Sequence, residues 1–283
     1  MNLTSPSQVK AWCIENDFHP NKTLGQNFLI DQNALKAIVD AGLESTNRRI
    51  DESTNSPRVL EIGPGMGVLT EEMLKRGCAV TAIEKDPVLA ARLAEALGNP
   101  PNLTVIAGDA LDYLSQSTNR RIDESMNSPF SCMISNLPYQ AGTRILLELV
   151  QARELPVMTA LVQTEVAERL AAKEGSKTRG LAGVWAQLDY DVSIVRKVSA
   201  SCFWPRPEIG SSVVRLVRHD RNLDFSAEER KFFHNLTKKA FEHRRKQLGS
   251  IFKNMIQSTA RAEELSNQDW INLTKGLMEN ENA

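Results

Sequence analysis

Cysteine is scarce in this chain of 283 residues, and the few cysteines present lie far apart. They are Cys13, Cys78, Cys132 and Cys202, and no two of them form a C-x-x-C pair. The histidines are scattered in the same way. Because zinc sites and disulfide frameworks show closely spaced or regularly paired ligands, we expect neither here, and we expect no bound metal.

The chain also lacks a long apolar run and a strong excess of either charge. No segment has the length and apolarity to cross a bilayer, and residues 1–6 do not show the basic-then-apolar order of a secretory signal. The formal net charge is −1. We therefore expect a cytoplasmic protein without membrane association. The length suffices for one large α/β domain and a smaller domain.

Glycines gather directly after the first strong apolar segment. Residues 58–62, Arg-Val-Leu-Glu-Ile, have the pattern of a buried strand, and an apolar-periodic helix is predicted over 68–76. Between them, Gly63 and Gly65 permit positive φ and let the backbone approach a ligand closely, while the helix amino terminus favours an anionic group. Gly67 comes two residues after Gly65, so the spacing differs from G-x-G-x-x-G and argues against NAD.

Two further predicted strands lead to acidic residues. A strand over 79–83 runs into Glu84, about 20 residues after Gly63, a spacing that suits a carboxylate on ribose hydroxyls. A strand over 103–106 leads to Asp109. Either carboxylate alone is as readily a solvated loop cap. Because such strands end at one sheet edge, the set predicts an adenosine ligand, with Glu84 on the ribose and Asp109 near the adenine amine.

The segment Asn-Leu-Pro-Tyr at 136–139 follows a predicted strand over 131–135 to the same edge. The side-chain oxygen of Asn136 and a backbone carbonyl can accept the two hydrogens of a planar exocyclic amine, while the ring of Tyr139 stacks on its π face. On its own such a tetrapeptide is more often an ordinary turn. Its place beside the glycine turn and the two carboxylates favours a ligand-binding role.

The remaining strand patterns complete a sheet. They lie over 157–162, 191–198 and 211–218. Seven strands with a late hairpin-like pair predict a doubly wound α/β sheet that is mostly parallel, with one reversed edge strand. Near Asp220 the pattern turns helical, with a capping box at Ser226. We therefore predict one domain over 1–219 and a small, all-helical domain over 220–283.

Basic side chains are concentrated in the predicted helical domain. Between 230 and 253 they are opposed only by Glu242, and apolar residues recur there at helical spacing. A charged run of this kind is usually a solvated helix face, but beside the adenosine-site motifs we expect phosphate contact. The candidate contacts are Lys238, Lys239, Arg244, Arg245 and Lys246. A second basic segment, 173–180, is predicted to form a loop over the active site.

One segment occurs twice. Residues 45–57 recur at 117–129, with only Thr54 replaced by Met126. Both copies are polar, end in proline and directly precede a predicted strand, so we expect exposed loops opposite the active edge. We interpret them as tolerated insertions; a regulatory or RNA-contact role is the alternative.

Six segments of the chain together resemble one known family, the small-subunit (16S) ribosomal RNA adenine N6,N6-dimethyltransferases of the KsgA type. The resemblance covers about residues 20–255. It rests on segments 22–29, 61–65, 136–139, 163–169, 203–207 and 241–246. The glycine turn alone is typical of all S-adenosylmethionine-dependent methyltransferases, whereas the first and last segments are typical of enzymes that act on RNA adenine.

The resemblance implies a Rossmann-like class I methyltransferase fold, S-adenosyl-L-methionine as cofactor, and dimethylation of two adjacent adenosines near the 3′ end of the RNA during ribosome assembly. The residues that would bind the cofactor are Asn27, Leu29, Gly63, Gly65, Glu84, Asp109 and Asn136. The residues that would bind or act on the target base are Asn136, Leu137, Pro138, Tyr139 and Phe203. Asn136 and the Leu137 carbonyl would draw on the N6 amine, with Tyr139 and Phe203 packing on the base.

The expected partners are small-subunit ribosomal RNA and an immature 30S-type subunit, bound by a monomer. Three alternatives remain open at this level. One is a large-subunit rRNA adenine methyltransferase of the antibiotic-resistance type, another is a mainly non-catalytic assembly factor, and the third is a small-molecule methyltransferase. The third would not require the basic carboxyl-terminal helices.

Overall fold

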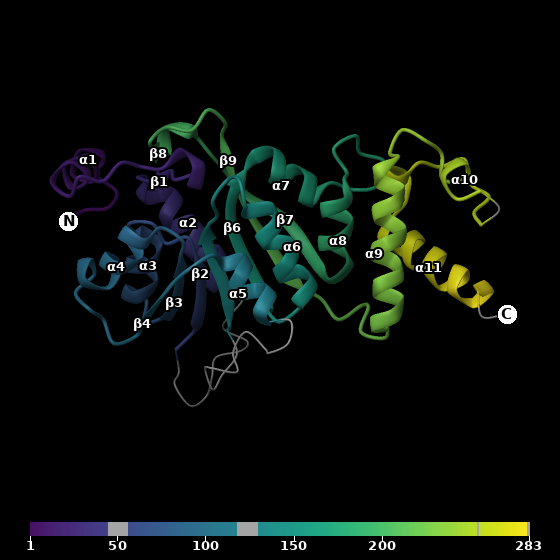
Figure 1. The fold of residues 1–283 in the computed structure, drawn as a ribbon, viewed down its shortest axis with the longest axis horizontal. Coiled ribbons are helices and arrows are strands. Elements are labelled where there is room, and N and C mark those ends of the chain that lie inside the picture. The colour runs from purple at the N-terminus through teal and green to yellow at the C-terminus, as the bar shows by residue number, and fades with distance from the viewer. Residues whose placement is uncertain (45–55, 118–129, 254, 282–283) are drawn as a thin grey trace. The chain divides into compact units, whose positions relative to one another are not determined.

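The structure, a computed structural model, describes residues 1–44, 56–117, 130–253 and 255–281. Contacts between residues divide the chain, whose ribbon is drawn in Figure 1, into two units. The first unit comprises Met1–Ala167 and Ser193–Arg218, and the second comprises Glu168–Val192 and His219–Ala283. The repeated segments 45–57 and 117–129 lie almost entirely outside the described residues, so the interpretation of them as exposed insertions stays a prediction.

A seven-stranded sheet in the order β4-β3-β2-β5-β6-β9-β7 forms the centre of the first unit. The strands are β2 (Arg58–Ile62), β3 (Ala79–Glu84), β4 (Leu103–Ala107), β5 (Cys132–Asn136), β6 (Val157–Gln163), β7 (Tyr190–Val198) and β9 (Ser211–Arg218). All seven predicted strands are confirmed, with ends within one residue of those expected. A separate two-stranded sheet pairs β1 (Phe28–Leu29) with β8 (Phe203–Trp204).

The direction and order of the strands create a crevice at one edge. β2 pairs in parallel with both β3 and β5, β3 pairs in parallel with β4, and β5 pairs in parallel with β6. The chain therefore builds outward from β2 on one side and returns to its other side with β5. Ligands of open α/β sheets bind where the order reverses in this way, outside the carboxyl ends of the strands.

The reversed strand lies one position inside the edge, which corrects the expected arrangement. β9 pairs antiparallel with β6, and β7 occupies the outer position. Burial explains this order. The first four residues of β9 are all buried, whereas β7 is mostly exposed between its two ends and carries Arg196 and Lys197. Charged, exposed side chains suit an edge strand, because they discourage pairing with another chain.

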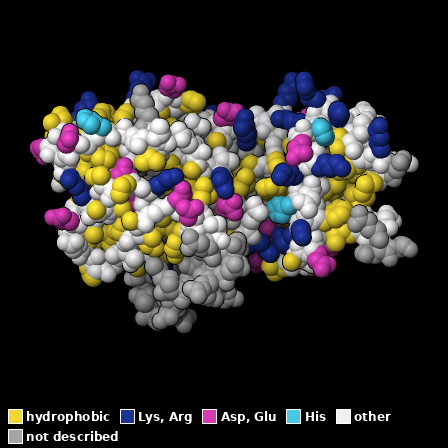
Figure 2. Space-filling model, in the orientation of Figure 1, with side chains coloured by type: hydrophobic (Ala, Val, Ile, Leu, Met, Phe, Trp, Pro, Cys, Tyr) yellow, Lys and Arg dark blue, Asp and Glu magenta, His cyan; other side chains and the backbone are white. Residues whose placement is uncertain are grey.

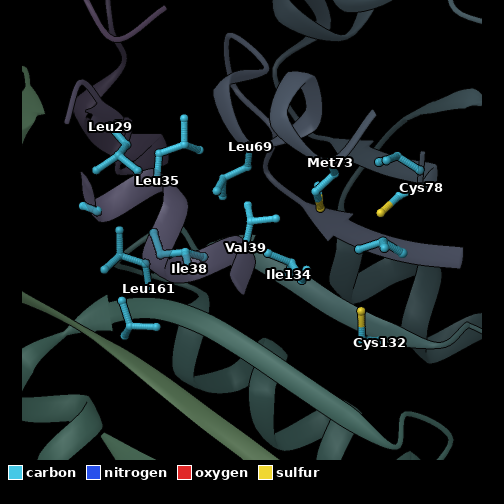
Figure 3. Packing of buried hydrophobic residues seen from close by; sticks show 14 of the residues in the cluster. Leu29, Leu35, Ile38, Val39, Leu69, Met73, Cys78, Cys132, Ile134 and Leu161 are labelled. Atoms are coloured by element: carbon cyan, nitrogen blue, oxygen red, sulfur yellow. The ribbon is translucent and has the colours of Figure 1, made fainter. Parts of the chain in front are cut away.

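The first unit also contains helices, most of which pack on the sheet and form the main core with it. They are α1 (Pro6–Glu15), α2 (Gln32–Leu43), α3 (Val68–Lys75), α4 (Pro87–Ala96), α5 (Ala110–Ser117), α6 (Gly142–Ala152) and α7 (Thr164–Ala171), of which α7 ends in the second unit. In Figure 3, Ile38, Val39 and Met73 lie among the buried side chains between α2, α3 and the strands. Cys78 and Cys132 belong to this core as free thiols, and burial raises the pKa of Cys78 to about 11.

Two helices that follow strands of the sheet have well-defined ends. Asp86 caps α4, because its Oδ1 accepts from the Val88 N–H at 2.9 Å and the Leu89 N–H at 3.2 Å. α3 begins directly after Gly67 and ends at the Arg76 cap. Both helices therefore start immediately after the carboxyl end of a strand, with their amino termini toward the crevice.

The second unit is helical and has its own core. It contains α8 (Leu181–Asp189), α9 (Ala227–Glu242), α10 (Leu248–Ile251) and α11 (Asn267–Glu281). The predicted capping box is confirmed: Ser226 Oγ accepts from the Glu229 N–H at 3.1 Å, and the Glu229 carboxylate accepts from the Ser226 N–H at 2.7 Å. No described helix has both the length and the apolarity to cross a membrane.

The second unit includes a segment that the sequence analysis assigned to the larger domain. Residues 168–192 belong to it because α8 packs against α9: Trp185 Nε1 donates to Thr237 Oγ1 at 3.0 Å, and Val184 joins the core around Phe233. The apolar face of α9 is thus covered by an earlier helix as well as by α11. The predicted boundaries at 1–219 and 220–283 omit this exchange.

Candidate active site

A cavity of about 170 Å³ lies at the carboxyl ends of β2, β3, β4 and β5. It brings together nearly all the site residues predicted from the sequence: Asn27, Leu29, Gly63, Gly65, Glu84, Asp109, Asn136, Leu137, Pro138 and Tyr139. Leu3 and Val9 at the amino terminus also line it, which the sequence analysis did not anticipate. The cavity therefore joins four strand ends and one amino-terminal segment in a single site.

The glycine turn forms one wall of the cavity, and its glycines bring the backbone close to the enclosed space. Gly65 has a φ of 59°, and a Cβ added there would lie 3.1 Å from Phe28 Cε1. Its N–H donates to Glu84 Oε2 at 2.9 Å. Positive φ and the close aromatic ring both require glycine at this position. The turn is thereby held against the end of the neighbouring strand.

Glu84 is almost fully buried beside the turn, with 6% of its surface exposed. Its Oε1 accepts from the Asp86 N–H at 2.8 Å, and its Oε2 accepts from Gly65. Burial raises the pKa of this carboxyl, against the lowering effect of the two backbone N–H groups. Each carboxylate oxygen has a second lone pair, so Glu84 can still accept hydrogen bonds from ligand hydroxyls.

Asp109 lies at the end of β4 and is paired with a residue that the sequence analysis did not single out. Lys85 Nζ donates to Asp109 Oδ2 at 2.7 Å, and the Leu111 N–H donates to Oδ1 at 2.9 Å. The hydrogen bond from Lys85 holds the pKa of Asp109 below its usual value. At neutral pH this side chain is therefore an ionised acceptor at the cavity wall.

A second missed residue, Glu61, is buried beneath the glycine turn. It is 1% exposed, and its Oε2 accepts from Thr70 Oγ1 at 2.7 Å, while its Oε1 has no hydrogen-bond partner among the described residues. The pKa of Glu61 is raised to about 8, mainly by burial and to a smaller extent by the Glu84 charge, against the lowering effect of the Thr70 hydroxyl. Glu61 and Thr70 connect β2 to α3 on either side of the turn. The sequence signal was a lone acidic residue inside an apolar strand.

The turn at 136–139 faces the glycine turn and is covered by the amino-terminal segment. Asn136 Nδ2 donates to the Asn27 carbonyl at 3.1 Å, and Asn27 Nδ2 donates to the Gly25 carbonyl at 3.1 Å. The side-chain oxygen of Asn136 and the carbonyl oxygen of Leu137 accept no hydrogen bond from the described part of the chain. Two acceptors are thus available close together on this turn.

Tyr139 completes the turn with a half-buried ring. Its hydroxyl forms a 2.6 Å hydrogen bond with Ser211 Oγ of β9. Burial raises the pKa of the phenol, and the bond with Ser211 acts in the opposite direction. The Pro138 carbonyl accepts from the Gly142 N–H at 2.7 Å, so the turn leads directly into α6.

Phe203 does not share the site, and its predicted contact with the base is not supported. Its side chain is 2% exposed and belongs to the main hydrophobic core, and its backbone pairs with Leu29 across the two-stranded sheet. Phe203 does not line the cavity. Its neighbour Trp204 instead stacks on Phe28, with ring centroids 6.4 Å apart. The Phe-Trp-Pro motif gave no indication of which face of the short strand is buried.

Comparison with known proteins agrees with this geometry. A family model described as "Ribosomal RNA adenine dimethylase" matches residues 17–279. The chain belongs to this family. Ribosomal RNA small subunit methyltransferase A of Deinococcus radiodurans is 42% identical to it over 214 residues, 76% of this chain and 67% of that protein. The protein of the same name from Staphylococcus haemolyticus is 34% identical over 93% of this chain and 85% of its own length.

Solved structures of similar proteins have the same fold. A dimethyladenosine transferase from Plasmodium falciparum superposes with a TM-score of 0.69 at 22% identity, covering 89% of this chain and 97% of its own. The 23S rRNA methyltransferase ErmE gives 0.65 at 24% identity, covering 89% of this chain and all of its own. At these identities the likeness shows the fold alone. The predicted Rossmann-like methyltransferase fold of this dimethylase family member is confirmed.

The basic residues predicted to contact RNA lie together in the second unit, but they are not equivalent. Lys and Arg side chains gather over the carboxyl-terminal end of α9 and the loop before α8 (Figure 2). Lys238, Lys239, Arg245 and Lys246 are exposed. The Arg244 guanidinium is engaged: it donates to the Lys177 carbonyl and lies 3.7 Å from the Glu263 carboxylate.

The loop over 173–180 is fixed to the rest of the second unit by hydrogen bonds. Besides Arg244, the Glu263 carbonyl secures it by accepting from the Gly175 N–H at 2.8 Å. Arg179 is 1% exposed, and its Nη2 donates to Asn267 Oδ1 at 2.7 Å. The expected position over the active site stays a prediction. In the described residues, no three His, Cys, Asp or Glu side chains gather in a way that could hold a metal.

Proposed function

We propose that this chain transfers methyl groups from S-adenosyl-L-methionine to the N6 amine of adenosines in small-subunit ribosomal RNA. The main support is the single cavity in which the glycine turn, Glu84 and the 136–139 turn meet at the point where the strand order reverses. The family match and the names of the two curated relatives support the choice of RNA adenine as substrate.

The residues of the cavity fit this cofactor. S-adenosyl-L-methionine supplies a methyl group that is already activated by a positively charged sulfur. Gly63 and Gly65 line the cavity and add no side chain to it, which leaves room for the cofactor's methionine part. Glu84 would accept from the ribose hydroxyls, Asp109 would hold the adenine, and Asn27 and Leu29 would close over the cofactor.

The turn at 136–139 fits the target amine. An adenine amine is a poor nucleophile because its lone pair is delocalised into the ring. Acceptance of its two hydrogens by Asn136 Oδ1 and the Leu137 carbonyl would favour a pyramidal nitrogen with its lone pair directed at the donor. Tyr139 would stack on the base. These residues would act by position and electrostatics and need no strong base, because the proton can leave to water.

The base must leave its stack to reach this turn, so we propose that the RNA presents an extruded or unpaired adenosine. We further propose that both methyl groups are added, on two adjacent adenosines near the 3′ end during ribosome assembly. The family description as a dimethylase supports the first point. The partner would be an immature 30S-type subunit, and the protein would act in the cytoplasm as a monomer without a metal.

Contact with the RNA is proposed for the exposed cations of the second unit. Lys238, Lys239, Arg245 and Lys246 are exposed and form no ion pair among the described residues. Such side chains neutralise phosphates without reading sequence. The assignment of RNA contact to residues 220–283 stays a prediction. We add the basic loop at 173–180 to the proposed contact surface, because it belongs to the same unit.

The direct test is to incubate the protein with labelled S-adenosyl-L-methionine and undermethylated small subunits, and to map the modified nucleotides. We expect label on N6 of adenosines in small-subunit RNA and none on large subunits offered in parallel. Label on large subunits alone would favour the antibiotic-resistance type of enzyme. Absence of label on either, with tight binding of small subunits, would favour a non-catalytic assembly factor.

A matched pair of variants links the activity to the site. Asn136→Ala removes the proposed acceptor, and we expect methyl transfer to fall at least about 100-fold while subunit binding remains. Asn102→Ala serves as the control, because the Asn102 amide donates to the Cys78 carbonyl at 2.7 Å and Asn102 does not line the cavity. Unaltered methylation by Asn136→Ala would remove this residue from the mechanism.

A further inference from the structure

The ring of Tyr139 is held at both of its ends. At the backbone end, the turn is fixed by the Leu137 N–H, which donates to the Leu161 carbonyl at 3.1 Å, and by the Pro138 carbonyl, which accepts from Gly142. At the other end, the phenol hydroxyl reaches Ser211 Oγ at 2.6 Å. A tyrosine side chain turns about two bonds, and a fixed hydroxyl restricts both. The orientation of the ring is therefore set by a strand distant in the sequence.

Ser211 is a buried polar residue at the end of the central sheet. It is fully buried at the start of β9, its backbone pairs with Gln163 of β6, and the residues that follow include Val213 and Val214. A buried hydroxyl is costly without a hydrogen bond. Among the described residues, the Ser211 hydroxyl bonds to Tyr139. Packing alone gives no reason for a serine at this position, whereas the hydrogen bond with the Tyr139 phenol does.

We propose that Ser211 is a positioning residue for methyl transfer: by bonding the Tyr139 hydroxyl, it fixes the plane on which the target base stacks. The inference rests on the proposed function. A base stacked on an aromatic face follows the tilt of that face. A free ring would let the base amine drift from the acceptors at Asn136 and Leu137. Displacement of a reacting group by one ångström or less slows reactions markedly. Loss of the Tyr139–Ser211 hydrogen bond therefore lowers the rate of methyl transfer.

The adjacent residue provides a matched control. Ser212 is also fully buried, and its Oγ shares a 3.0 Å hydrogen bond with Thr164 Oγ1. Consecutive residues of a strand point to opposite faces of the sheet, so Ser212 is directed away from Tyr139. Ser212→Ala and Ser211→Ala each remove one buried hydroxyl from the same strand. Only the second frees the ring.

The test compares Ser211→Ala, Tyr139→Phe, the double variant and Ser212→Ala with the wild-type protein, on undermethylated small subunits at saturating cofactor. We expect Ser211→Ala and Tyr139→Phe each to lower kcat about five- to tenfold, because a freed ring holds the base less often in the reactive orientation. The double variant should be no slower than the slower single variant, because both changes remove the same bond. Ser212→Ala should retain kcat within about twofold while losing a similar amount of thermal stability.

Two further readouts separate positioning from general damage. The affinity of Ser211→Ala for S-adenosylhomocysteine, measured by calorimetry, should equal that of the wild type, because the cofactor wall is untouched. Ser211→Thr keeps the hydroxyl, so its kcat should return to within about threefold of the wild-type value. Equal kcat values for Ser211→Ala and Ser212→Ala, or multiplicative effects in the double variant, would overturn the inference while leaving the proposed function intact. A wild-type protein that transfers no methyl group would overturn both.

Discussion

At the scale of the residue, the buried Glu61 predicts how stability depends on pH. Its pKa lies at about 8 in the folded chain and near 4.5 when exposed. Between these values the folded state holds one more proton, so the free energy of unfolding falls as pH rises, by at most about 1.4 kcal/mol per pH unit from this group. Below and above that window the group adds no slope.

Glu61→Gln removes this dependence while keeping an acceptor for Thr70. We expect the thermal stability of the variant, relative to the wild type, to increase from pH 5 to pH 8 and then to level off. Thermal unfolding of both proteins across this range measures the difference. Parallel profiles would contradict the raised pKa of Glu61 in the folded chain.

Several residues of the site followed from the sequence, and others did not, for a common reason. Glu84, Asp109 and Asn136 were predicted because each follows a strand, and parallel strands carry such residues to one edge. The bond between Tyr139 and Ser211 and the burial of Phe203 depend on how distant segments meet. Periodicity within a segment holds no information about contacts between distant segments, so only the structure could show these features.

At the scale of the element, the limited space around the glycine turn leads to a prediction about substitution of Gly65. Gly65→Ala forces a side chain into positive φ and toward Phe28. We expect affinity for S-adenosylhomocysteine to fall at least about tenfold and stability to fall by about 1–3 kcal/mol. Calorimetry and thermal unfolding measure the two effects. Gly98→Ala is the control, because Gly98 also has positive φ (82°) but has no atom within 4 Å of an added Cβ.

The control separates strain from fit. We expect Gly98→Ala to lose stability through backbone strain alone and to keep its affinity. If both variants bound the ligand as the wild type does, the glycine turn would not be the cofactor wall. If both lost affinity equally, the effect would come from general destabilisation and not from the cavity.

The loop before α8 makes a second prediction at this scale. Arg244 holds the loop by its bond to the Lys177 carbonyl, whereas Arg245 is exposed. We expect Arg244→Gln to speed amide hydrogen exchange at 175–179, and Arg245→Gln to leave exchange there unchanged. Both should weaken binding to small subunits, and Arg245→Gln should reduce the salt dependence by about one charge. Unchanged exchange in Arg244→Gln would refute the holding role.

The elements themselves were largely predictable, but their order was not fully so. Apolar runs and caps located all seven strands and the start of α9, because strand and helix periods differ clearly. The sequence did not place β9 inside the edge, because the choice depends on which strand buries both faces. Its run of buried residues was visible in the sequence, but pairing with β6 was needed to interpret it.

At the scale of the whole molecule, the second unit draws on two parts of the chain, which predicts the result of truncation. Removal of residues 219–283 would take away Phe233 and Trp270 and expose Val184 and Leu188 of α8. We expect the truncated protein to associate in size-exclusion chromatography and to bind a dye for exposed apolar surface. A monomeric product with a sharp thermal transition would contradict this division.

Loss of activity in such a truncation would therefore say little about RNA binding, and single substitutions are the better probe. The net charge of −1 gave no indication of an RNA partner, because acidic residues elsewhere in the chain balance the basic cluster of the second unit. The binding of small subunits should consequently weaken as the salt concentration rises, although the net charge of the whole chain is near zero.

The most direct test of the central claim is a structure of the protein with S-adenosylhomocysteine and an adenosine-containing RNA fragment. The account predicts the cofactor ribose at Glu84, its amino-acid part beside Gly63 and Gly65, and the N6 of the target base within hydrogen-bond distance of Asn136 Oδ1 and the Leu137 carbonyl. A cofactor bound outside this cavity, or a target base that does not reach the 136–139 turn, would contradict it.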